Sequence, residues 1–226
     1  MNGPPFFHAS FFWIEFVYSI FVVLAVLLVY LKTREMYKLT EHKGIKYFSL
    51  TFLFFAIAHI FRFFFRIFFR TFFTSPGFFM PGRPPFRIGS LIFTYTSVMA
   101  GLFLLYSLIW RKIKLNEKIV ILIFNLIAVL TVILDLLVLN PFIHIIIITL
   151  LFLVAALLSF TRKSRKKHPF VIAYLLIFLI WILNSVFIEV PRSIFELRFV
   201  SYMISVILYL VILWRIFKSK NGKKTR

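Results

Sequence analysis

The sequence predicts an all-α fold, a polytopic membrane protein in which seven transmembrane helices form one bundle. Three observations lead to this prediction. Of the 226 residues 62% are hydrophobic, apolar runs of spanning length occur seven times, and basic residues collect between alternate runs. A soluble domain is usually nearer half apolar, so the excess indicates a lipid environment. We expect a single membrane domain over residues 1–226.

Each apolar run approaches the roughly 20 residues that a helix needs to cross the hydrocarbon core. The predicted spans cover residues 12–31, 47–73, 88–110, 118–139, 142–160, 170–189 and 195–217. The stretch Met1–Ser10 before the first span has no Lys or Arg, so we expect that span to be retained. Asn140 and Pro141 alone separate the fourth and fifth spans, which predicts a tight turn. All nine prolines lie outside the span interiors, so we expect unbroken helices.

Charge gives the predicted orientation. Five, four, five and six basic residues lie in the stretches 32–46, 111–118, 162–167 and 215–226, which share one side of the membrane if seven helices alternate. The other connections hold Arg83, Arg87, Arg192 and Arg198. The positive-inside rule then places the N-terminus outside and the C-terminus in the cytoplasm of a multi-pass cell-membrane protein. We expect the bilayer as partner, with anionic lipids against the basic stretches and tail, and no nucleic acid.

The second span carries an unusual polar stripe. His59, Arg62, Arg66 and Arg70 are spaced by three, four and four residues, which places them within about 80° of one helix face. A guanidinium in hydrocarbon costs at least a few kcal/mol. Arg62 is therefore expected to face the bundle interior or a hydrated cavity.

Polar side chains at a similar predicted depth can form ion pairs or hydrogen bonds with these charged groups. Their shared feature is a place in the outer half of a span or beside an outer turn. They are Glu15, Tyr95, Asp135, Asn184, Glu189 and Tyr202. Together with the stripe they form the predicted ligand-binding set, since forked guanidinium groups bind carboxylate or phosphate at two points. The alternative is structural, in which Arg62 pairs with Asp135 while Arg66 and Arg70 reach lipid phosphates.

Several classes of protein are disfavoured. The chain has no cysteine, which excludes disulfides, thiolate metal sites and cysteine nucleophiles. No span holds a central lysine for a retinal Schiff base. His59 and His144 lie at different predicted depths, which argues against paired haem ligation, and against zinc bound with Asp135. We expect no catalytic residues, no metal and no cofactor.

One stretch resembles known proteins. The run Tyr37–Phe48, followed by Phe54, Phe55, Ala58 and His59, is similar to uncharacterised archaeal seven-span proteins. The predicted threading resembles the seven-helix sensor regions of prokaryotic signalling proteins. This resemblance implies a receptor-like role and assigns no functional residue.

The functional hypothesis is a sensor that binds a small anionic or polar ligand from the outer side and signals through a separate partner. Two alternatives stay open. A small transporter or channel for an anionic solute would use the same arginine-lined cavity. A structural subunit of a membrane complex would use the arginines in salt bridges.

Overall fold

The computed structural model describes residues 5–72, 84–113, 115–138, 142–161, 171–189 and 195–221. Side chains are described for residues 13–65, 88–113, 115–137, 145–161, 171–184 and 199–218. All structural statements below refer to these parts of the chain.

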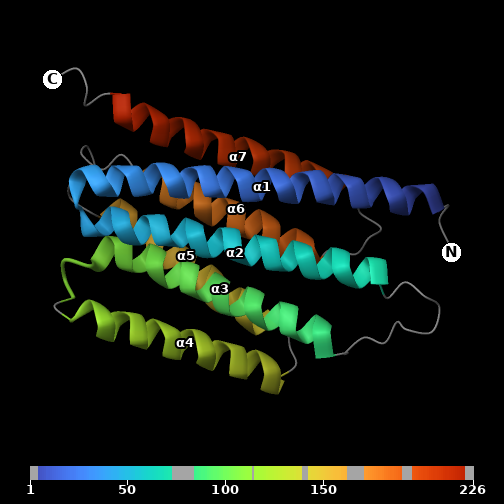
Figure 1. The fold of residues 1–226 in the computed structure, drawn as a ribbon, viewed down its shortest axis with the longest axis horizontal. Coiled ribbons are helices and arrows are strands. Elements are labelled where there is room, and N and C mark those ends of the chain that lie inside the picture. Colours follow the sequence, from blue (N-terminus) through green and yellow to red (C-terminus); the bar gives the residue numbers. More distant parts are fainter. Residues whose placement is uncertain are drawn as a thin grey trace.

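Seven α-helices make up the described part of the molecule (Figure 1). They are α1 (Pro5–Thr40), α2 (Lys43–Phe72), α3 (Pro84–Ile109), α4 (Glu117–Val138), α5 (Phe142–Thr161), α6 (Val171–Glu189) and α7 (Phe195–Asn221). The prolines Pro5, Pro84 and Pro85 stand at the first positions of α1 and α3, where the missing N–H has no intrahelical partner to lose.

Five helices are long and apolar enough to cross a membrane. These segments are Trp13–Thr40, Lys43–Phe65, Ile88–Ile109, Glu117–Leu137 and Phe199–Lys218. In α5 and α6 the apolar segments with described side chains, Ile145–Thr161 and Val171–Asn184, are shorter. The prediction of an all-helical membrane protein is therefore supported.

Two helices continue well beyond their apolar runs. The sequence predicts the first span to end at Leu31, but α1 continues to Thr40, and α7 continues through Arg215 and Lys218 to Asn221. Lys32, Arg34 and Lys38 thus lie on a helix and not in a loop. Charged residues such as Lys, Arg and Glu are good helix formers, so the end of the apolar run does not end the helix. Only Glu41 and His42 separate α1 from α2.

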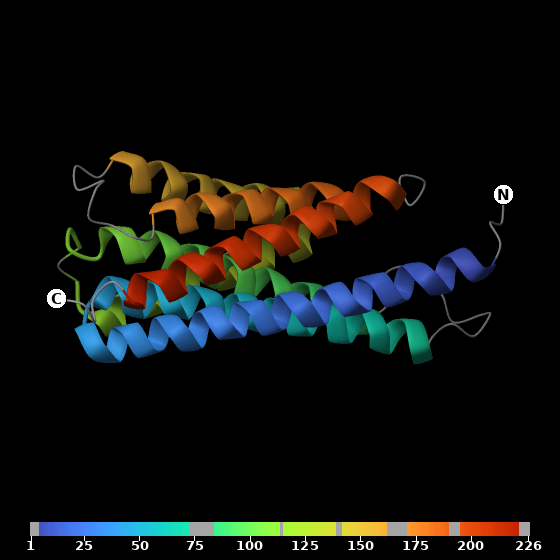
Figure 2. The same ribbon diagram turned by 90° about the horizontal axis from the view of Figure 1, so that it is seen from above.

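Six helices pack as a closed ring. Around it α1 contacts α2, α2 contacts α3, α3 contacts α5, α5 contacts α6, α6 contacts α7, and α7 returns to α1. The fourth helix stands outside this ring and packs mainly on α3. Figure 2 shows α5 and α6 on one side of the bundle and α1 and α2 on the other, with α7 running between them.

Large aromatic side chains fill the centre of the ring. The rings of Phe55 on α2, Phe152 on α5 and Trp181 on α6 contact one another, with centroids 5.4 to 6.5 Å apart. Nearer the end of the bundle that holds the C-terminus, the rings of Phe48 and Tyr174 contact each other, with centroids 5.1 Å apart. The Tyr174 hydroxyl shares a 2.7 Å hydrogen bond with Ser107 on α3. These contacts tie α2 to helices on the far side of the ring.

The helix α1 buries one stripe and exposes another. On α1 the buried positions Val22, Val26 and Val29 follow helical spacing, whereas Leu24, Leu28 and Leu31 are exposed. Exposed leucine and isoleucine at such positions is the pattern expected of a surface that faces lipid. The apolar exterior of α1 therefore lies on the face opposite to the one that packs inside the bundle.

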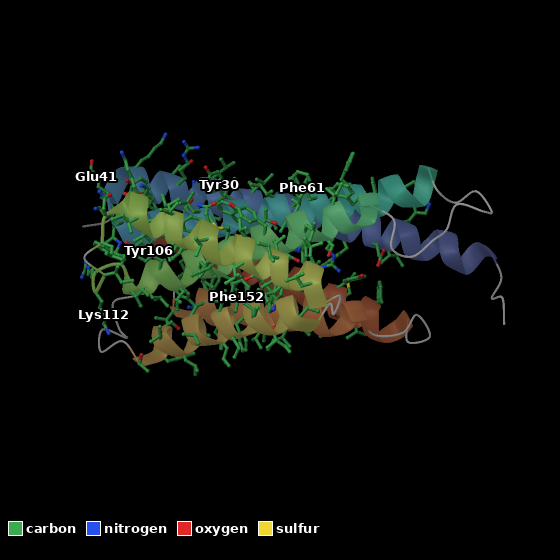
Figure 3. The ribbon with its side chains drawn as sticks, turned by 90° about the horizontal axis from the view of Figure 1, so that it is seen from below. Tyr30, Glu41, Phe61, Tyr106, Lys112 and Phe152 are labelled. Atoms are coloured by element: carbon green, nitrogen blue, oxygen red, sulfur yellow. The ribbon has the colours of Figure 1, made fainter. Side chains whose placement is uncertain are left out.

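The ends of the bundle differ in charge. The turn between α1 and α2, the connection between α3 and α4, and the C-terminus lie at one end, and the N-terminus lies at the other (Figure 1). Glu41 and Lys112 mark this shared end in Figure 3, with Tyr106 and then Phe152 further along the bundle. We call it the basic end, because Lys38, Lys43, Lys46, Arg111, Lys112 and Lys118 lie at its helix termini.

Candidate functional site

A hydrogen-bonded group of side chains lies inside the ring, towards the end opposite the basic end. The Tyr18 hydroxyl on α1 donates to Asn184 Oδ1 on α6 over 2.8 Å. Asn184 Nδ2 donates to the Ile180 carbonyl oxygen over 2.8 Å and lies 3.3 Å from the Ser205 hydroxyl on α7. One amide thus joins three helices at a single point.

A second link joins α1 to α7 beside the first. The Tyr202 hydroxyl donates to Glu15 Oε1 over 3.0 Å, and the rings of Tyr18 and Tyr202 stack with centroids 4.3 Å apart. We define the Tyr18 cluster as Glu15, Tyr18, Asn184, Tyr202 and Ser205. In a low-dielectric bundle such bonds are retained because an unsatisfied polar group there is expensive.

Arg62 lies on α2 at the border of this cluster. Its guanidinium carbon is 5.4 Å from the centroid of the Phe93 ring on α3, a cation–π distance. The Arg62 side chain is partly buried, and its charge interacts electrostatically with both Tyr18 and His59. The guanidinium therefore contacts α3 and lies within electrostatic range of Tyr18 on α1.

His59 is bonded within its own helix. Its Nδ1 lies 2.9 Å from the Phe55 carbonyl oxygen one turn earlier, and its ring contacts the Phe55 ring at 6.0 Å. Because a carbonyl only accepts, this Nδ1 carries the proton. His59 thus contacts the aromatic centre of the bundle through Phe55 and interacts electrostatically with Arg62.

Two predicted site residues join α3 to α4, outside the ring. Asp135 on α4 accepts a 3.4 Å hydrogen bond from the Thr94 hydroxyl, and the Tyr95 hydroxyl donates to Asn125 Oδ1. Asn125 Nδ2 in turn donates to the Ile121 carbonyl oxygen over 2.8 Å. These residues hold the outlying α4 against α3. They contribute none of the hydrogen bonds of the Tyr18 cluster described above.

The structure thus sorts the predicted set. Glu15, Asn184 and Tyr202 come together, with Arg62 and His59 beside them, whereas Asp135 and Tyr95 belong to a different pair of helices. The backbones of Arg66 and Arg70 lie on α2, and Glu189 is the last residue of α6. The side chains of these three, and that of His144, lie outside the described residues.

Tyr18 and Ser205 were not among the predicted site residues. A signal was present, because Tyr18 follows Glu15 by three residues and Ser205 follows Tyr202 by three. Residues three apart share a helix face. This spacing indicates a polar face on each of the two spans, but it does not show that the two faces meet.

Among the described residues no group of three or more His, Asp or Glu side chains has a geometry that could hold a metal ion. The polar contacts around Tyr18 instead consist of hydroxyl, amide, carboxylate and guanidinium groups. Such groups bind organic or inorganic ions by hydrogen bonds.

Similarity to an archaeal protein shows the family to which this chain belongs. An uncharacterized protein of Archaeoglobus fulgidus is 30% identical over 213 residues, which cover 90% of this chain and 91% of the relative. The chain belongs to the family of that protein. No family model matches the chain, and no solved structure matches it. The name of the archaeal family member states no activity, so the family assigns none to this chain.

Proposed function

We propose that the chain is a seven-span protein of the cell membrane, with its N-terminus outside and its C-terminus in the cytoplasm. Five helices meet the length and composition of a span, and α5 and α6 have 20 and 19 residues in total. The gathering of lysines at the basic end supports a cytoplasmic location for it. Anionic lipids would contact these lysines at about 1 kcal/mol per charge.

We further propose that the Tyr18 cluster and Arg62 bind a small anionic or polar ligand from the outer side. The single observation that carries this proposal is the convergence of Tyr18, Asn184 and Tyr202 beside a partly buried guanidinium. Ionisable residues inside membrane bundles usually mark ligand or ion sites, because their burial is otherwise disfavoured. Arg62 provides the charge and the cluster hydroxyls and amide provide orientation.

The proposed output is a signal to a separate partner. The cluster connects α1, α6 and α7, and two of these helices, α1 and α7, continue into the basic end. A ligand that alters the Tyr18–Tyr202 contact would act on both. Transport is a weaker proposal, because transporter sites often use interrupted helices and each described helix runs without a break.

A thermal-shift screen of purified protein in detergent tests ligand binding, with small carboxylates and inorganic phosphate as probes. A ligand that binds only the folded state raises the unfolding temperature, and the rise grows with the logarithm of the ligand concentration above its Kd. We expect a stabilising probe whose effect is lost in Arg62→Leu and reduced in Tyr18→Phe. The matched control is Tyr95→Phe, which deletes a hydroxyl from the α3–α4 contact and should keep the response.

Liposome uptake separates the remaining roles. Arginine-dependent flux of a labelled anion would show that the protein is a transporter and not a sensor. If no carboxylate or phosphate shifts the unfolding temperature and Arg62→Leu merely destabilises the protein, Arg62 is a structural residue, as in a subunit of a membrane complex.

A further inference from the structure

A compact junction at the basic end joins α1, α2 and α3. Glu41, which follows α1, has a φ of 49°, and its N–H donates to the Tyr37 carbonyl oxygen over 2.7 Å. His42 comes next, and its carbonyl oxygen accepts from the N–H groups of Ile45 and Lys46. His42 is therefore the residue that caps the N-terminus of α2.

The last turn of α3 encloses this cap. A Cβ added to Gly44 would lie 2.8 Å from Trp110 Nε1, 3.0 Å from His42 Cε1 and 3.0 Å from the Ser107 carbonyl oxygen. The His42 ring meets the Trp110 ring edge-on, with centroids 5.3 Å apart and an interplanar angle of 85°. The histidine ring is thus held between α2 and α3 by packing.

The contact with Arg111 fixes the protonation state of His42. Arg111 Nη2 lies 3.3 Å from His42 Nε2. A guanidinium has five N–H groups and no acceptor, so Nε2 must be the acceptor. This geometry requires a neutral imidazole. The imidazolium would direct an N–H and a positive charge at the guanidinium.

The charges around His42 are mainly positive. Arg111 comes from the end of α3, while Lys43 and Lys46 come from the first turn of α2. Glu117 from the start of α4 is bonded to Lys46, and Glu41 precedes His42 in the chain. The N-terminus of α2 adds a partial positive charge. Protonation of His42 is therefore opposed in this junction.

We propose that the His42–Arg111 contact is a proton-sensitive joint between α2 and α3. Acidification places a proton on Nε2, breaks the contact and separates the first turn of α2 from the end of α3. The neutral form is favoured only in the intact junction, so its contribution to stability is present at high pH and lost as pH falls. Histidine ordinarily titrates near pH 6.5, within the physiological range. This inference does not depend on the ligand proposed for the opposite end.

The indole N–H signal of Trp110 provides a direct test. It is measured by NMR on the full chain in detergent micelles and is assigned by its loss in Trp110→Phe. Trp110 Nε1 is buried against Gly44 and has no hydrogen-bond partner among the described residues, so its signal should respond to movement of the joint. Between pH 8 and pH 5 we expect a single-midpoint shift of this signal. The exposed Trp214 on α7 is the internal control, and its signal should stay still.

Two variants decide the assignment. His42→Asn places a good N-capping side chain without a titrating group before α2 and should abolish the Trp110 shift. Arg111→Gln removes one positive charge and should move the midpoint to higher pH. A Trp110 signal that does not move in the unmodified protein, or that moves equally in His42→Asn, would overturn the proposal.

Discussion

The Tyr18 hydroxyl and the Asn184 side-chain oxygen lie 2.8 Å apart, so one hydrogen bond closes α1 onto α6 across 166 residues of chain. Asn184 also donates to the Ile180 carbonyl oxygen and to the Ser205 hydroxyl. The bonds of Asn184 to Tyr18 and Ser205 explain how α1, α6 and α7 remain in one register inside an apolar bundle.

We expect Asn184→Leu to lower the free energy of unfolding by about 1–3 kcal/mol, because it leaves the partly buried Tyr18 hydroxyl without this acceptor. Tyr18→Phe should have a smaller effect. The double variant should be less destabilised than the sum of the two, since neither partner is then left unsatisfied. Denaturant unfolding in detergent measures all three. Strict additivity would show that the two side chains do not interact.

The ion pair between Lys46 on α2 and Glu117 on α4 should stabilise the basic end modestly. Both side chains are about one-third exposed, so we expect Glu117→Lys to cost about 1 kcal/mol and to cost less at high salt. The exchanged variant Lys46→Glu/Glu117→Lys should regain most of the loss. No recovery in the exchanged protein would argue against direct pairing.

Glu41 adopts a left-handed backbone conformation that penalises a side chain by about 1–2 kcal/mol. Glu41→Gly should therefore raise the unfolding temperature. Lys38→Gly, three residues earlier inside the last turn of α1, is the control and should lower it, because glycine weakens a helix. A drop in both variants would mean that the Glu41 side chain contributes more than its strain.

Gly44→Ala should destabilise the protein, although alanine favours helices, because the new methyl group meets the Ser107 carbonyl oxygen and Trp110. Gly101→Ala is the matched comparison. Its Cβ would lie 3.2 Å from two carbons of the Leu151 side chain, which can move slightly. We expect a clearly larger loss of thermal stability at Gly44. Equal effects would mean that the end of α3 moves away freely.

The proposed orientation can be checked by labelling with a membrane-impermeant maleimide, since the chain has no cysteine. A cysteine at Lys112 should be protected in intact cells and react after lysis. A cysteine at Ser75, in the connection between α2 and α3, should react in intact cells. The reverse pattern would invert the bundle.

Hydropathy and charge predicted the bounds of the helices well. They predicted poorly which helices pack against each other. The expected bounds differ from those of α3 to α6 by at most four residues, because an apolar run of this length has no stable alternative to a helix in lipid. Composition does not locate the end of α1, since Lys32 to Thr40 favour a helix in water as well as near lipid.

The candidate site was predicted only in part for a related reason. Counting residues along a span gives the depth of Glu15, Asn184 and Tyr202, and it gives a similar depth for Asp135. It does not say that α4 stands outside the ring, where Asp135 meets Thr94. Which helices share a face depends on packing between segments far apart in the sequence. No local pattern contains that information.

The length of α1 has a mechanical consequence. At about 1.5 Å per residue its 36 residues form a rod of roughly 54 Å, nearly twice the roughly 30 Å of hydrocarbon. An unbroken rod transmits tilt along its whole length. If α1 pivots at the middle of its span near residue 22, Tyr18 lies about 6 Å and Thr40 about 27 Å from the pivot, so a small sideways displacement near Tyr18 would swing Thr40 several times further in the opposite direction.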